Sequence, residues 1–139
     1  MPIVRRAYVA AVLMWAMTLP LATYAATRVH ATTATHLYAF IAYTIGSLVC
    51  HQKPDRSFHL WATRMPVCAR CTGIYLGAVA GILLRSAKAA RSTLLLASLP
   101  TIATLVFEWI TGVTPSNTVR FAAGLPLGMV VSWLVVEYT

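Results

Sequence analysis

The sequence predicts an all-α, polytopic bundle of transmembrane helices. Of the 139 residues, 59% are hydrophobic and only 10% are charged, whereas soluble domains carry roughly 25% charged residues. The mean hydropathy is +0.73, and a soluble domain of this size has too little interior to hide so much apolar surface. The apolar residues also form continuous runs, without the alternation of a membrane β-barrel. We therefore expect a single integral membrane domain over residues 1–139.

Five apolar runs predict about five spans. The runs cover residues 8–27, 36–50, 66–84, 93–111 and 119–138. The first has no charge and matches the roughly 20 residues that cross a hydrocarbon core, and Pro20 is expected to kink it. A secretory signal peptide has similar features, but we favour a retained helix. The second run is short, so four spans result if it is re-entrant. Ser116 or Asn117 is expected to cap the last helix.

Glycines are spaced four residues apart in two of these runs. The third run contains Gly73, Gly77 and Gly81, and the fifth contains Gly124 and Gly128. Glycines at this spacing line one face of a helix and let another helix backbone come close. We expect both runs to pack tightly against neighbours within one bundle.

The strongly basic charge fits a membrane surface better than nucleic acid. The formal net charge is +8, from eleven Lys or Arg residues against three acids. These basic residues flank the apolar runs, where they meet anionic headgroups. The chain has no basic stripe with interleaved aromatic residues, the pattern typical of nucleic-acid binding. The expected partners are therefore the lipid bilayer and other membrane subunits, with no nucleic acid.

All three cysteines lie at the two ends of the polar loop between the second and third runs. Cys68 and Cys71 form a C-x-x-C pair, and Cys50 lies eighteen residues before Cys68, directly followed by His51. Three cysteines and one histidine match a closed tetrahedral zinc site. The sequence therefore predicts zinc or another transition metal at Cys50, His51, Cys68 and Cys71. Because adjacent ligands rarely reach one ion, His59 is the alternative to His51.

The same thiols allow other chemistry. Cys68 and Cys71 fall in the first turn of the third run, where the helix N-terminus together with Arg64 and Arg70 favours the thiolate form. A thiolate binds metals and also attacks disulfides. Three alternatives to a structural metal thus remain. They are a membrane thiol-disulfide oxidoreductase coupled to a quinone, a catalytic metal site, and cysteines that are simply buried as small side chains.

Glu108 is an acid within the fourth apolar run. An ionised group there is costly unless it is paired, so an intramembrane acid is a candidate functional residue. Its candidate partners are Arg120, Arg70 and Arg56. Arg120 falls in the first turn of the fifth run, where a cation opposes the helix dipole and calls for a phosphate or carboxylate partner. A further alternative is therefore recognition of a phosphate-bearing lipid or substrate by these arginines and Arg64.

Three segments, "CHQKPDRSF", "PVCARCTGIYLG" and "SNTVRFAAG", resemble a family of small prokaryotic integral membrane proteins of unknown function. The resemblance covers residues 49–128, and that family places an aspartate near the position of Glu108. It implies a protein of the prokaryotic cytoplasmic (inner) membrane and implies no activity. It also implies a shared polar site made of Cys50, His51, Arg56, Ser57, Cys68, Arg70, Cys71, Asn117 and Arg120.

These features favour a small membrane protein with a zinc-like Cys/His site, a structural or accessory subunit of a larger membrane assembly rather than an enzyme. The second predicted site is polar or anion-binding, and its residues are Arg56, Ser57, Arg70, Glu108, Asn117 and Arg120.

Overall fold

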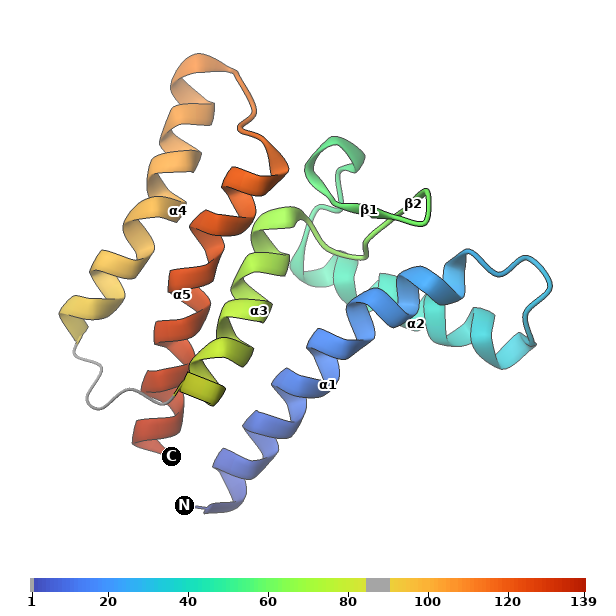
Figure 1. Ribbon diagram of the computed structural model, residues 1–139, viewed down its shortest axis with the longest axis horizontal. Helices are drawn as coiled ribbons and strands as arrows, with labels where there is room; N and C mark the ends of the chain where they lie inside the picture. The colour runs from blue at the N-terminus through green and yellow to red at the C-terminus, as the bar shows by residue number, and fades with distance from the viewer. Residues whose placement is uncertain (1, 85–90) are drawn as a thin grey trace.

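The computed structural model describes residues 2–84 and 91–139, and this part of the chain is built from five α-helices (Figure 1). The predicted all-α fold is confirmed. The helices are α1 (Pro2–Ala26), α2 (Thr33–Val49), α3 (Ala69–Leu84), α4 (Arg91–Thr111) and α5 (Asn117–Tyr138). Between α2 and α3 lie a single 3-10 turn, η1 (Pro54–Arg56), and two short strands, β1 (His59–Leu60) and β2 (Thr63–Arg64).

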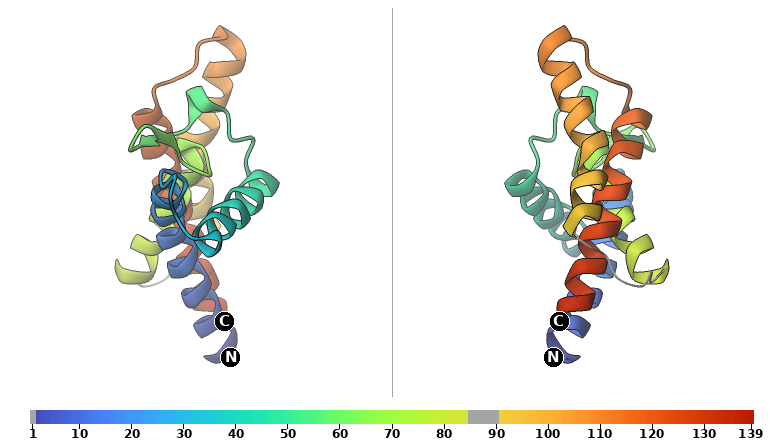
Figure 2. Two further views of the ribbon diagram at one scale, coloured as in Figure 1. Left: turned by 90° about the vertical axis from the view of Figure 1, so that its right-hand side faces the viewer. Right: turned by 90° about the vertical axis from the view of Figure 1, so that its left-hand side faces the viewer.

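Four of the helices run along the bundle in alternating directions, and α2 runs across it. Figure 1 shows α1 and α4 pointing toward the end that carries the β1–β2 hairpin, while α3 and α5 point away from it. The side views show α2 projecting from the bundle, with both chain ends at the end opposite the hairpin (Figure 2). The second apolar run thus forms a helix that lies across the other four helices rather than along them.

Three helices are long and apolar enough to cross a membrane, judged by length and composition. They contain the segments Ile3–Ala26, Ser92–Thr111 and Asn117–Tyr138, and the apolar helix Ala69–Leu84 is shorter. Only 11% of the α4 segment is buried, so most of its apolar side chains point outward. Soluble monomers rarely expose an apolar surface of this extent, and acyl chains or another membrane protein would cover it in a bilayer.

The glycine spacing brings α3 and α5 into backbone contact. A Cβ atom placed on Gly73, Gly77 or Gly81 would collide with a carbonyl oxygen of α5, and one on Gly124 or Gly128 would collide with a carbonyl oxygen of α3. Both predicted faces therefore pack, and they pack on each other. Close approach of this kind maximises dispersion contacts, which drive helix association where water is absent.

Side-chain caps define where two of the helices begin. The Thr32 side chain accepts a hydrogen bond from the Thr35 backbone N–H, and Ser116 does the same for Val119. Ser116, rather than Asn117, is therefore the cap of α5. Pro20 lies inside α1, which continues through it.

The β1–β2 hairpin is a feature that the sequence did not indicate, since strands were not expected. His59 pairs with Arg64, and Leu60 with Thr63. The turn residues Trp61 and Ala62 have φ angles of 50° and 61°. Left-handed residues at both turn positions usually carry Asn or Gly, so a Trp-Ala turn gives no recognisable signal.

Candidate functional site

Three sulfur atoms meet at the hairpin end of the bundle. Cys50 is the C-cap of α2, Cys68 precedes α3, and Cys71 lies in the first turn of α3. Their Sγ atoms all lie within 4.8 Å of one another, and each side chain is half-buried. Thiolates around one tetrahedral zinc ion are about 3.8 Å apart, because each Zn–S bond is about 2.3 Å. A small closing movement would therefore let these three residues, the sulfur cluster, hold one ion.

Hydrogen bonds within the sulfur cluster lower the pKa of Cys50 and favour its thiolate form. The Cys68 thiol and then the Cys71 thiol hold the pKa of Cys50 well below its usual range, against the opposing effect of burial. The Cys68 backbone N–H also donates to the Cys50 Sγ, at 3.1 Å. The arginines expected to stabilise a thiolate have other partners, since Arg64 donates to the Gln52 carbonyl and Arg70 pairs with Glu108.

Neither predicted histidine joins the sulfur cluster. His51 and His59 both have exposed side chains. Among the described residues, the group of potential ligand atoms contains only the three sulfurs. The structure therefore brings Cys50, Cys68 and Cys71 together, and His51 and His59 lie outside this group.

Gln52 fastens the loop that carries the sulfur cluster. Its Nε2 atom donates to the backbone carbonyls of Tyr43 and Pro66, each at 2.7 Å. Its backbone has a φ of 45°, and its carbonyl accepts from Arg64 Nη1 at 3.0 Å. Gly46 leaves room for this arrangement, because a Cβ there would collide with the Pro66 carbonyl. Sequence reasoning did not select Gln52, although it stands beside His51 in the "CHQ" segment.

Removing the Gln52 amide is expected to loosen the sulfur cluster. In Gln52→Leu, the Tyr43 and Pro66 carbonyls lose their common hydrogen-bond donor. The affinity of the three thiols for added zinc should then fall about 10- to 100-fold, as it does when the outer-shell partners of metal ligands are removed. Competition with a chromophoric zinc chelator measures this affinity. Ser47→Ala is the control, since Ser47 is an exposed residue of α2 whose hydroxyl donates to the Thr44 carbonyl of the same helix. Equal affinities in both variants would contradict the assigned role of Gln52.

An apolar core lies against the sulfur cluster. Leu19, Met65 and Val67 are buried there, and Cys50 and Cys71 pack against them. An adjoining cavity of about 320 Å³ is almost wholly apolar. It is lined by Ala16, Leu19, Pro20, Phe58, Leu60, Met65, Thr72, Leu76 and Phe121. The sulfurs are thus shielded by hydrocarbon on the α1 side.

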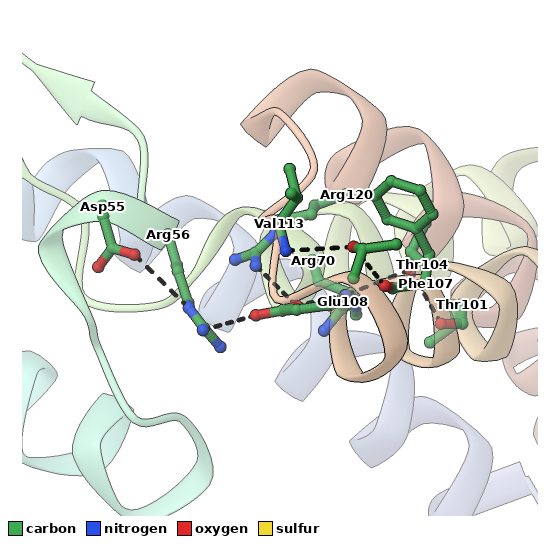
Figure 3. Close-up of polar contacts among 10 residues, drawn as sticks. Asp55, Arg56, Arg70, Thr101, Thr104, Phe107, Glu108, Val113 and Arg120 are labelled. Atoms are coloured by element: carbon green, nitrogen blue, oxygen red, sulfur yellow. Dashed lines mark hydrogen bonds and ion pairs between the residues drawn. The ribbon is translucent and has the colours of Figure 1, made fainter.

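A second polar group surrounds Glu108 near the end of α4 (Figure 3). Its carboxylate lies 2.8 Å from Arg120 Nη2, 2.5 Å from Arg56 Nη2 and 3.9 Å from Arg70 Nη2. All three partners suggested by the sequence are therefore present. Glu108 is 9% exposed and Arg120 only 2%. We call these four residues the arginine cluster.

Ser57 and Asn117 tie the arginine cluster to the loop. Ser57 is fully buried, and its hydroxyl donates to the Lys53 carbonyl at 3.1 Å. The Asn117 side-chain amide donates to the Ser57 carbonyl at 3.2 Å. This link connects the start of α5, which carries Arg120, with the residue that follows Arg56. All six residues predicted for the polar site thus gather at one end of the bundle.

A family assignment follows from the segment that carries both clusters. Residues 50–134 match the family described as Predicted membrane protein (DUF2085). The chain belongs to this family. The DUF2085 segment begins at Cys50 and includes every member of the two clusters, while α1 and α2 lie outside it. The protein is therefore a membrane protein, and the part shared with its family is the part that builds the two polar groups.

Two similar proteins are both described as uncharacterized. An uncharacterized protein of Methanothermobacter thermautotrophicus is 45% identical to this DUF2085 chain, over 58% of the chain and 78% of the relative. The uncharacterized protein MJ1492 of Methanocaldococcus jannaschii is 50% identical, over 30% of the chain and 27% of the relative. No solved structure matches the chain.

Proposed function

We propose that this membrane protein binds one soft transition-metal ion, zinc or a similar metal, through the thiolates of Cys50, Cys68 and Cys71. The observation that supports this most is the convergence of three sulfurs within 4.8 Å from two segments eighteen residues apart. Soft thiolate ligands select zinc and copper(I) over hard cations such as magnesium. The lowered pKa of Cys50 adds support, because the thiolate is the form that binds metal.

The proposed ion has a structural role. It would join the end of α2, through Cys50, to the start of α3, through Cys68 and Cys71. Three thiolates leave the fourth position of a tetrahedral ion without a cysteine ligand, and we propose that a water molecule takes this position, with His51 as the competing candidate. The outward-facing apolar surface of α4 fits an accessory subunit that packs against another protein in the prokaryotic cytoplasmic membrane.

Metal analysis of the full chain, purified from membranes of cells grown with added zinc, tests the proposal. Wild-type protein should retain about one equivalent of metal, and Cys50→Ser, Cys68→Ser or Cys71→Ser should each retain less than about a tenth. His51→Gln is the matched variant: it keeps the metal if water is the fourth ligand and loses most of it if the imidazole binds. A wild-type content below about a tenth of an equivalent contradicts the proposal.

Disulfide exchange is the second candidate function. The observation in its favour is that the Cys50 sulfur lies beside two further cysteine sulfurs and close to an apolar cavity large enough for a quinone ring. Oxidation of two thiols to a disulfide would release two electrons and two protons, which a membrane quinone would accept to become a quinol.

Thiol trapping separates the two functions. For the metal site, alkylation of the three cysteines should be slow and should speed up after a chelator removes the ion. For disulfide exchange, adding a soluble quinone should remove two of the three alkylatable thiols, and a reductant should restore them. Three thiols that react freely under every condition would contradict both functions.

A further inference from the structure

We propose that the arginine cluster binds an oxyanion, specifically a phosphate group, at the hairpin end of the bundle. The site is independent of the sulfur cluster and needs no metal. Its residues come from four separate elements: Arg56 from η1, Arg70 from α3, Glu108 from α4 and Arg120 from α5.

The charges within the arginine cluster do not balance. Three guanidinium groups surround one carboxylate, and arginine does not deprotonate in proteins. Asp55 also lies 3.6 Å from Arg56 Nε, but its side chain is 63% exposed, so water screens that contact strongly. Unpaired charge is costly away from water. A phosphate monoester brings roughly two negative charges, which would neutralise the three arginines and Glu108 together.

Hydrogen-bond donors in the cluster also lack acceptors. The Nε atoms of Arg56, Arg70 and Arg120 are all buried, and none has a hydrogen-bond partner within the described part of the chain. Buried donors are nearly always satisfied in native proteins. Guanidinium groups present their N–H donors in a planar fork that fits phosphate oxygens. Three such groups aimed at one carboxylate leave donors free for a second anion.

The backbone favours an anion at the same place. The helices α3 and α5 both begin at this end of the bundle, with Arg70 and Arg120 in their first turns. A helix N-terminus carries partial positive charge, which attracts anions and repels the arginines. The Glu108 carboxylate offsets part of the repulsion between the arginines and the helix N-termini. A bound phosphate would offset the rest.

The location allows two sources of phosphate. The cluster lies where α3 and α5 start and α4 ends, at the depth expected for lipid headgroups at one membrane surface. Either an anionic lipid or a free phosphate ion could supply the same chemistry. The two sources differ in whether acyl chains are needed, so separate probes distinguish them.

The test uses the full chain, delipidated in a neutral detergent, and calorimetric titration with inorganic phosphate, short-chain phosphatidic acid and short-chain phosphatidylcholine. Saturable binding of phosphatidic acid alone identifies a lipid, and saturable binding of both phosphatidic acid and inorganic phosphate identifies the free ion. Arg56→Gln should weaken the binding at least about tenfold, because it removes a charge-assisted donor. Arg56 is the most exposed of the three arginines, at 32%, so this variant is the one best suited to keep its fold.

The control is Lys53→Gln, which makes the same charge change at an exposed position three residues before Arg56. It should bind within about twofold of wild type. Thermal unfolding of both variants without ligand verifies their integrity. The proposal is overturned if neither phosphate probe binds, if phosphatidylcholine binds equally well, or if Arg56→Gln and Lys53→Gln bind alike.

Discussion

Gly128→Leu is expected to separate α3 from α5 and to lower the stability of the protein more than any other single change in the bundle. A side chain at this position would run directly into the Ile74 carbonyl and the Ala78 backbone nitrogen. Overpacking a core commonly costs about 1–3 kcal/mol even when side chains can shift. Here the obstructing atoms belong to the backbone of α3, so we expect about 3 kcal/mol or more. Thermal unfolding in a mild detergent measures the loss.

Ala122→Leu provides the matched control for this prediction. Ala122 lies on the same helix, six residues earlier, and its side chain is exposed. The same leucine there should change the unfolding temperature little. If Gly128→Leu and Ala122→Leu unfold at the same temperature, the contact between α3 and α5 contributes less than the glycine geometry indicates.

Glu108→Gln is expected to produce the second large loss of stability. The carboxylate is the shared partner of Arg56, Arg70 and Arg120, and the neutral amide would leave three guanidinium groups facing one another. Removing one partner from a buried ion pair typically costs about 3–5 kcal/mol. Because Arg56 is partly exposed, we expect Glu108→Gln to lose about 3 kcal/mol of unfolding free energy, the lower end of this range. Chemical unfolding in detergent micelles would report the difference.

Three further variants show whether charge is the cause of this loss of stability. Glu137→Gln removes an exposed carboxylate near the end of α5 and should be close to neutral, whereas Glu108→Asp should retain much of the wild-type stability. The double variant Glu108→Gln with Arg56→Gln should recover part of the loss, because it removes one of the uncompensated charges. If the double variant loses more stability than the two single variants lose together, charge repulsion is not the cause.

The membrane fold could be predicted because hydropathy and glycine spacing act locally. An apolar run of about 20 residues has few alternatives to a membrane helix. Glycines four residues apart, such as Gly124 and Gly128, mark a helix face on which a neighbouring helix can pack closely. The orientation of α2 is a different matter. Its 17 residues suit a short span or an oblique helix equally well, and its packing against α1 settles the choice. The hairpin was missed because Trp61 and Ala62 adopt left-handed backbone angles without the usual residues.

The candidate sites could be predicted in part for a similar reason. An acid among apolar residues requires a cation, so Glu108 pointed to arginines even before their positions were known. That Arg64 turns instead to the Gln52 carbonyl depends on the folded loop, which no spacing rule describes. The convergence of Cys50 with Cys68 and Cys71 followed from their clustering in sequence. The exposed position of His51 did not, because it depends on how the chain turns after α2.

The oblique course of α2 leaves four helices running along the bundle, which decides the end at which the two clusters lie relative to the start of α1 and the end of α5. Because α1, α3, α4 and α5 make an even number of passes along the bundle, the start of α1 and the end of α5 share one side (Figure 1). The sulfur cluster and the arginine cluster both lie at the opposite end of the bundle, where α3 and α5 begin and α4 ends. If the four helices along the bundle cross a membrane, the two clusters would lie toward the same membrane surface, opposite the surface that the start of α1 and the end of α5 approach.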